Sequence, residues 1–187
     1  GFTVTLIGLL VDLPAPILIP LMIVSGILVG AIWAAVPGLL KALFNVNEVI
    51  TCIMMNWIGA NVVTILFDKE SGPFKSLLDP SGTKNLAYVF KTTHNNVATS
   101  KFGLDLIFKG SQVNGGIIIA IIIAILIFII LDKTTFGYKL KACGSNKNAA
   151  KYAGINDKVA TIISMAIAGG LAGAGAALYY LSGNTEF

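Results

Sequence analysis

The segment from residue 133 to residue 155 contains the pattern that says most about function. Ser145 and Asn146 are favourable helix N-cap residues, and no helix breaker lies between them and Gly154. Gly154 stands where a left-handed C-terminal cap belongs. The pattern therefore predicts a helix of about two turns. Because so short a helix is marginal in water on its own, we expect it to dock on another surface.

The side chains of this predicted helix suit contact with a partner. Ala149 and Ala150 are small enough to let another surface approach closely. Lys147 and Lys151 lie one turn apart and put positive charge on the polar side, where acidic groups of a partner or lipid headgroups could meet it. The alternative interpretation is a solvated loop without a partner.

The sequence lacks the residue constellations that are typical of catalysis and of metal binding. It has no GxxxxGK[ST] loop, so ATP hydrolysis is expected on a separate chain. Cys52 and Cys143 have neither CxxC nor Cys/His spacing, and His94 is the single histidine. GxSxG and HExxH motifs and paired intramembrane aspartates are also missing. We therefore expect no enzyme activity, no cofactor and no metal site.

Composition points to a membrane protein. The chain is 56% hydrophobic and 12% charged, whereas soluble domains have roughly 25% charged residues. Apolar runs near the length of about 20 residues that a bilayer requires predict four spans, at residues 17–36, 48–67, 113–131 and 159–181. We expect an all-α, polytopic transmembrane helix bundle in one domain, 1–187. Gly1 is not an initiator and the run 2–11 is too short to span, so we expect a partial N-terminal span in a fragment of a longer polypeptide.

Charge distribution bears on orientation and excludes one class of partner. The net charge of +4 comes from lysines that are scattered over the loops, which argues against nucleic-acid binding. Seven of the thirteen lysines lie at position 41 and in the segment 132–158, so the positive-inside rule favours a cytoplasmic location for both. Residues 68–112 are then an irregular outer segment, and Pro37 with Gly38 is expected to close the first full span.

Two spans carry small residues that indicate helix packing, and a third lacks them. Gly26 and Gly30 share one helical face, as do Gly169 and Gly173, and this spacing lets two backbones approach closely. These helices are expected inside the bundle. Residues 117–131 are almost wholly Ile, Leu, Ala and Phe, which suits a helix at the lipid-facing periphery.

The span that begins at Glu48 carries a more polar stripe. The residues of this stripe share one helical face, which is expected to avoid lipid. They are Glu48, Cys52, Met55, Asn56 and Gly59, and Thr51 lies beside them. Asn56 is costly to leave unpaired inside a membrane, so we expect it to bond to another helix, to backbone, or to water in a substrate path. Thr51, Met55 and Asn56 are the candidates for the path. Asn47 and Glu48 are expected to cap the helix start.

Two segments, TTFGYKLKACGSNKNAAKYAGI and PGLLKALFNVNEVITCIMMNWIGA, resemble the membrane permeases of bacterial ABC importers of the ribose and branched-chain amino acid type. The second is similar to the form found in the subgroup that moves nucleosides and some simple sugars. The resemblance implies that residues 144–155 form a coupling helix in a groove of a cytoplasmic ABC ATPase. The residues implied in that contact are Gly144, Asn146, Ala149, Ala150, Gly154 and Ile155.

The same resemblance implies further partners and a location. It implies a second permease subunit, an extracytoplasmic substrate-binding protein and membrane lipid around a multi-pass protein of the bacterial cytoplasmic membrane. The main alternative is a secondary transporter driven by an ion gradient. Such a carrier usually needs intramembrane charged residues or broken helices, and here only Glu48 approaches the membrane.

Overall fold

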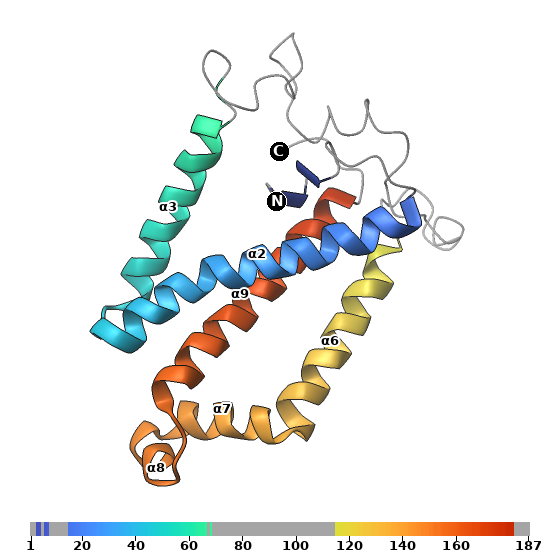
Figure 1. Ribbon diagram of the computed structural model, residues 1–187. Helices are drawn as coiled ribbons and strands as arrows, with labels where there is room; N and C mark the ends of the chain where they lie inside the picture. The colour runs from blue at the N-terminus through green and yellow to red at the C-terminus, as the bar shows by residue number, and fades with distance from the viewer. Residues whose placement is uncertain (1–2, 5, 8–14, 67, 69–114, 182–187) are drawn as a thin grey trace.

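The computed structural model describes residues 3–4, 6–7, 15–66, 68 and 115–181, and within these ranges it contains helices and no strand. The elements in chain order (Figure 1) are α2 Ala15–Phe44, α3 Glu48–Leu66, α6 Gly116–Lys133, α7 Thr135–Ser145, α8 Lys147–Tyr152 and α9 Asp157–Leu181. Four of them, α2, α3, α6 and α9, are long and apolar enough to cross a membrane. The predicted all-α, polytopic fold is confirmed. The outer segment 68–112, apart from Asp68, and most of the partial N-terminal span lie outside the described residues.

The crossing of α2 and α9 forms the centre of the bundle (Figure 1). A Cβ atom built on Gly26 would lie 2.9 Å from the carbonyl oxygen of Gly173, and one built on Gly30 would overlap the carbonyl oxygen of Gly169. Only glycine permits backbones to meet at this separation. Beside the crossing, apolar side chains form a small core of Val4, Leu18, Met22, Ile23, Ala177 and Leu181.

The first span is longer than the prediction, because Pro37 and Gly38 do not end it. α2 continues through both residues to Phe44, and both are buried. A Cβ atom on Gly38 would lie 3.2 Å from the Cα of Ile162 in α9. The glycine is therefore a packing position, and a neighbouring helix shields the backbone that the proline leaves without a hydrogen bond. The helix ends where Asn45 adopts a left-handed φ of 54°.

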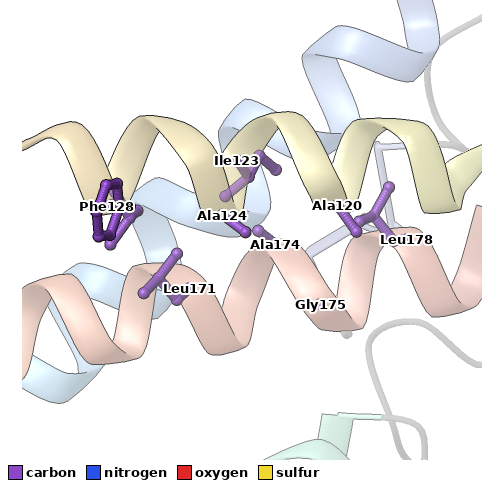
Figure 2. Close-up of a pocket in the computed structure, with 9 residues that line it drawn as sticks. Ala120, Ile123, Ala124, Phe128, Leu171, Ala174, Gly175 and Leu178 are labelled. Atoms are coloured by element: carbon purple, nitrogen blue, oxygen red, sulfur yellow. The ribbon is translucent and has the colours of Figure 1, made fainter.

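α6 lies at the edge of the described bundle and is separated from α9 by an apolar crevice. None of the α6 residues is buried, as the prediction of a peripheral helix requires. The crevice has a volume of about 470 Å³, and Figure 2 shows side chains of both helices around it. Its lining residues are Ala120, Ile123, Ala124, Ile127, Phe128, Leu171, Ala174, Gly175 and Leu178.

Candidate functional site

Residues 132–158 form two short helices, where the sequence predicted one. α7 precedes the predicted helix and was missed. Thr134 caps it, because the Gly137 backbone N–H donates to the Thr134 hydroxyl at 3.2 Å. The turn from α6 is so tight that a Cβ atom on Gly137 would overlap the backbone of Leu131. Lys141 binds Asp132 at 2.7 Å across this turn. Thr134, a favourable N-cap residue, is the local sequence signal for α7.

α8 is the predicted short helix, and it is capped at both ends. The Asn146 side chain accepts hydrogen bonds from the backbone N–H groups of Asn148 and Ala149, at 3.0 and 3.1 Å. Ser145 is instead the last residue of α7. At the other end Gly154 has a φ of 77°. The Ile155 N–H donates to the Ala150 carbonyl at 3.0 Å, as in a Schellman motif. These caps hold a six-residue helix that would be marginal alone.

The two alanines of α8 face different ways. Ala150 is only 3% exposed and packs with Cys143 of α7 and Ala160 of α9. Ala149 is exposed, together with Lys147, Lys151 and Tyr152. The paired-alanine surface expected from the sequence is therefore divided: Ala150 attaches α8 to the bundle, and Ala149 faces outward. Tyr152 is 95% exposed and is the most accessible large hydrophobic side chain of this corner.

A charged cavity of about 280 Å³ lies beside this corner. It separates the turn between α2 and α3 from α7, α8 and the start of α9, all of which lie at the same end of the bundle (Figure 1). Four charged residues line it: Lys41, Glu48, Lys147 and Asp157. The ammonium group of Lys41 forms an ion pair with the Glu48 carboxylate. Among the described residues, no cluster of three or more His, Cys, Asp or Glu side chains could hold a metal ion.

The path candidates on α3 have three different environments. Thr51 is buried, and its hydroxyl donates to the Asn47 carbonyl at 2.9 Å, so its polarity is satisfied within its own helix. Met55 is half-buried, whereas Asn56 is exposed. The Asn56 side chain makes no hydrogen bond with the described part of the chain. Asn47 accepts a hydrogen bond from the Val49 N–H at 3.0 Å and caps the helix, as expected, while Glu48 instead pairs with Lys41.

Comparison with known proteins gives a consistent assignment. Residues 2–186 match the family described as branched-chain amino acid transport system / permease component. A nucleoside ABC transporter permease protein of Lactococcus lactis subsp. cremoris, NupB, is 37% identical over 168 residues, which are 90% of this chain and 44% of that protein. A guanosine ABC transporter permease protein of Bacillus subtilis, NupP, is 32% identical over 172 residues, 92% of this chain and 46% of that protein.

A third relative is more distant. A glucose ABC transporter permease protein of Haloferax volcanii is 26% identical over 175 residues, 91% of this chain and 44% of that protein. No solved structure shows a significant match. The chain spans less than half the length of these curated relatives. Since the family match covers almost every residue, the chain belongs to the branched-chain amino acid transport system / permease component family.

Proposed function

We propose that this chain forms part of the transmembrane permease subunit of a bacterial ABC importer in the cytoplasmic membrane, and that nucleosides or simple sugars are its substrates. A second permease subunit completes the path, a cytoplasmic ABC ATPase supplies the energy, and an extracytoplasmic binding protein delivers the substrate. The relatives named for nucleoside, guanosine and glucose transport support the substrate class. The two with the higher identity favour a nucleoside.

The observation that carries the proposal is the construction of α8. The helix is fixed at both ends by caps and is attached to α9 through Ala150. Its opposite side presents Ala149, Lys151 and Tyr152 to the outside. A short helix that is capped at both ends and packed on a bundle can transmit a displacement from a partner to the bundle, because the helix does not unfold first. In the proposal the partner is the ATPase, and residues 144–155 are the coupling segment.

The remaining proposed contacts follow from α3. Asn56 offers a polar side chain and Met55 an adaptable one. They lie on a membrane helix that the other described residues leave largely exposed. We assign them to the substrate path, with Thr51 as a supporting residue. A gradient-driven carrier is less well supported, since the carboxylate of Glu48, the sole candidate from the sequence, is already paired with Lys41.

The test is uptake by the full-length protein purified with whatever remains bound after mild detergent. Proteoliposomes loaded with ATP are given radiolabelled guanosine, uridine or glucose together with the binding protein. Uptake that requires ATP and survives ionophores that collapse ion gradients is the expected result. If uptake does not require ATP and is abolished by ionophores, the protein is instead a secondary transporter. Mass spectrometry of the purified complex should find a stoichiometric P-loop ATPase.

A further inference from the structure

The charged cavity beside α8 has an uneven arrangement of ion pairs. Lys41, the last basic residue of α2, pairs with Glu48, the first residue of α3. Lys147, the first residue of α8, lines the same cavity and has no ion pair with any described residue. The carboxylate of Glu48 thus has one lysine in contact and a second across the cavity.

Apolar packing contacts border this cavity on two sides. On one side Gly38 of α2 lies against Ile162 and Met165 of α9. On the other side Ala150 holds α8 against Cys143 and Ala160. Glu48 itself is nearly half exposed, with 47% of its side chain accessible. The contacts that border the cavity are therefore apolar, while the groups that could bridge it are charged.

Lys147 and Glu48 both line this cavity, one from the start of α8 and the other from the start of α3. A lysine side chain is a flexible four-carbon stem with a point charge at its end, which suits an exchange of partners. A small inward movement of α8 would bring its ammonium group to the carboxylate. Lys41 and Lys147 would then compete for one acceptor.

We propose that Glu48 and Lys147 are positioning residues that link α8 to α3, and that Glu48 transfers from Lys41 to Lys147 when α8 moves. Glu48 is the first residue of the helix that carries Asn56, so the transfer tilts α3 relative to α2. The inference rests on the proposed function, because it assigns the route by which the ATPase reaches the substrate path. Neither residue contacts substrate in this assignment.

The test measures substrate transported per ATP hydrolysed in proteoliposomes of the full complex. Lys147→Glu should lower this ratio at least about fivefold, the lower end of ordinary allosteric coupling, because two carboxylates then face each other. Adding Lys41→Glu and Glu48→Lys to Lys147→Glu should restore much of the ratio, since reversing all three charges recreates both of the opposite-charge pairs between which the transfer takes place. Lys158→Glu is the matched control, because Lys158 is exposed at the same corner and does not line the cavity.

Asp157 is the competing partner, since it also lines the cavity. Rescue of Lys147→Glu by Asp157→Lys, without rescue by Lys41→Glu and Glu48→Lys together, would overturn the inference. A second readout is cross-linking of Glu48→Cys with Lys147→Cys, after Cys52 and Cys143 are replaced. Disulfide formation requires Cα atoms within about 7 Å, so its yield should rise when the ATPase is trapped with nucleotide.

The outcomes separate this inference from the proposed function. Wild-type vesicles without ATP-dependent uptake would overturn the proposed function and this inference with it. Normal wild-type uptake with an unchanged ratio in Lys147→Glu would overturn the inference alone. An equal gel-filtration profile for the single and swapped variants separates loss of coupling from loss of folding.

Discussion

Gly30 of α2 lies so close to Gly169 of α9 that a Cβ atom on Gly30 would overlap the Gly169 carbonyl oxygen. The same relationship recurs one turn away, where a Cβ atom on Gly173 would overlap the carbonyl oxygen of Gly26. These two contacts make the crossing of α2 and α9 rigid, so α3 and α8, which lie outside the crossing, are the elements that can move relative to it.

Gly173→Ala should destabilise the bundle, whereas Gly175→Ala should not. A Cβ atom on Gly173 would overlap the Gly26 backbone, which has no free volume to yield, and overpacking costs about 1–3 kcal/mol. A Cβ atom on Gly175 meets nothing within 4 Å and enters the crevice between α6 and α9. Thermal unfolding of the detergent-solubilised protein measures the difference.

The paired variants also control for helix propensity. Both substitutions replace glycine by alanine inside α9, so both gain the same intrinsic preference of about 1 kcal/mol. A lower melting temperature for Gly173→Ala alone supports the close crossing. Equal melting temperatures for the two variants would contradict it.

Ala150→Glu should reduce the stability of the subunit, whereas Ala149→Glu should weaken its contact with the ATPase. Ala150 is packed against Cys143 and Ala160, so a glutamate there overfills the contact and buries a charge without a partner. We expect a loss of about 2 kcal/mol or more and less folded protein on gel filtration. Ala149 is exposed, so the glutamate is tolerated in the isolated subunit and weakens only the contact with the ATPase.

Co-purification separates the two effects. Ala149→Glu should give a normal melting temperature and a reduced yield of bound ATPase. A normal yield from Ala149→Glu would exclude this face of α8 from the ATPase contact. A normal melting temperature for Ala150→Glu would contradict the inward packing of Ala150.

Gly154→Ala should loosen the end of α8. Gly154 has a φ of 77°, and alanine in the left-handed region costs about 1–2 kcal/mol. The hydrogen bond from the Ile155 N–H to the Ala150 carbonyl depends on that conformation. Hydrogen exchange at Ile155 should therefore speed up. Gly154→Asn should have a smaller effect, because asparagine tolerates this conformation, and equal exchange in all three proteins would contradict the cap.

The sequence was sufficient for features that depend on local chemistry. Apolar length predicted the four membrane helices, and Asn146 and Gly154 predicted both ends of α8, because a cap acts within a few residues of itself. The spacing of Gly26 and Gly30 pointed to a close helix crossing for the same reason, since every third or fourth residue shares a face. None of these required knowledge of a distant contact.

The features that the sequence did not predict depend on tertiary contacts. Pro37 and Gly38 form a strong local stop signal, yet α9 packs on Gly38 and the helix continues to Phe44. The inward direction of Ala150 depends on Cys143 and Ala160, which belong to other helices. Periodicity within a six-residue helix cannot say which of two alanines faces the bundle.

Asn56→Leu should alter transport, whereas Asn61→Leu should have a smaller effect. Both residues are exposed on α3, but the Asn61 amide donates to the Trp57 carbonyl at 2.9 Å and so satisfies part of its polarity within the helix. The Asn56 side chain has no hydrogen bond with the described residues and can bind a polar substrate group or a neighbouring helix. Initial uptake rates over a range of nucleoside concentrations separate these roles.

If Asn56 lines the path, Asn56→Leu raises KM or lowers the maximal rate while the melting temperature stays unchanged. A lower melting temperature with normal uptake kinetics would make Asn56 an interhelical bonding residue instead. A hydrogen bond between membrane helices contributes about 0.6 to 2 kcal/mol, which a thermal shift can resolve. Asn56→Gln keeps the amide and should preserve transport better than leucine, because the amide is the group that either role requires.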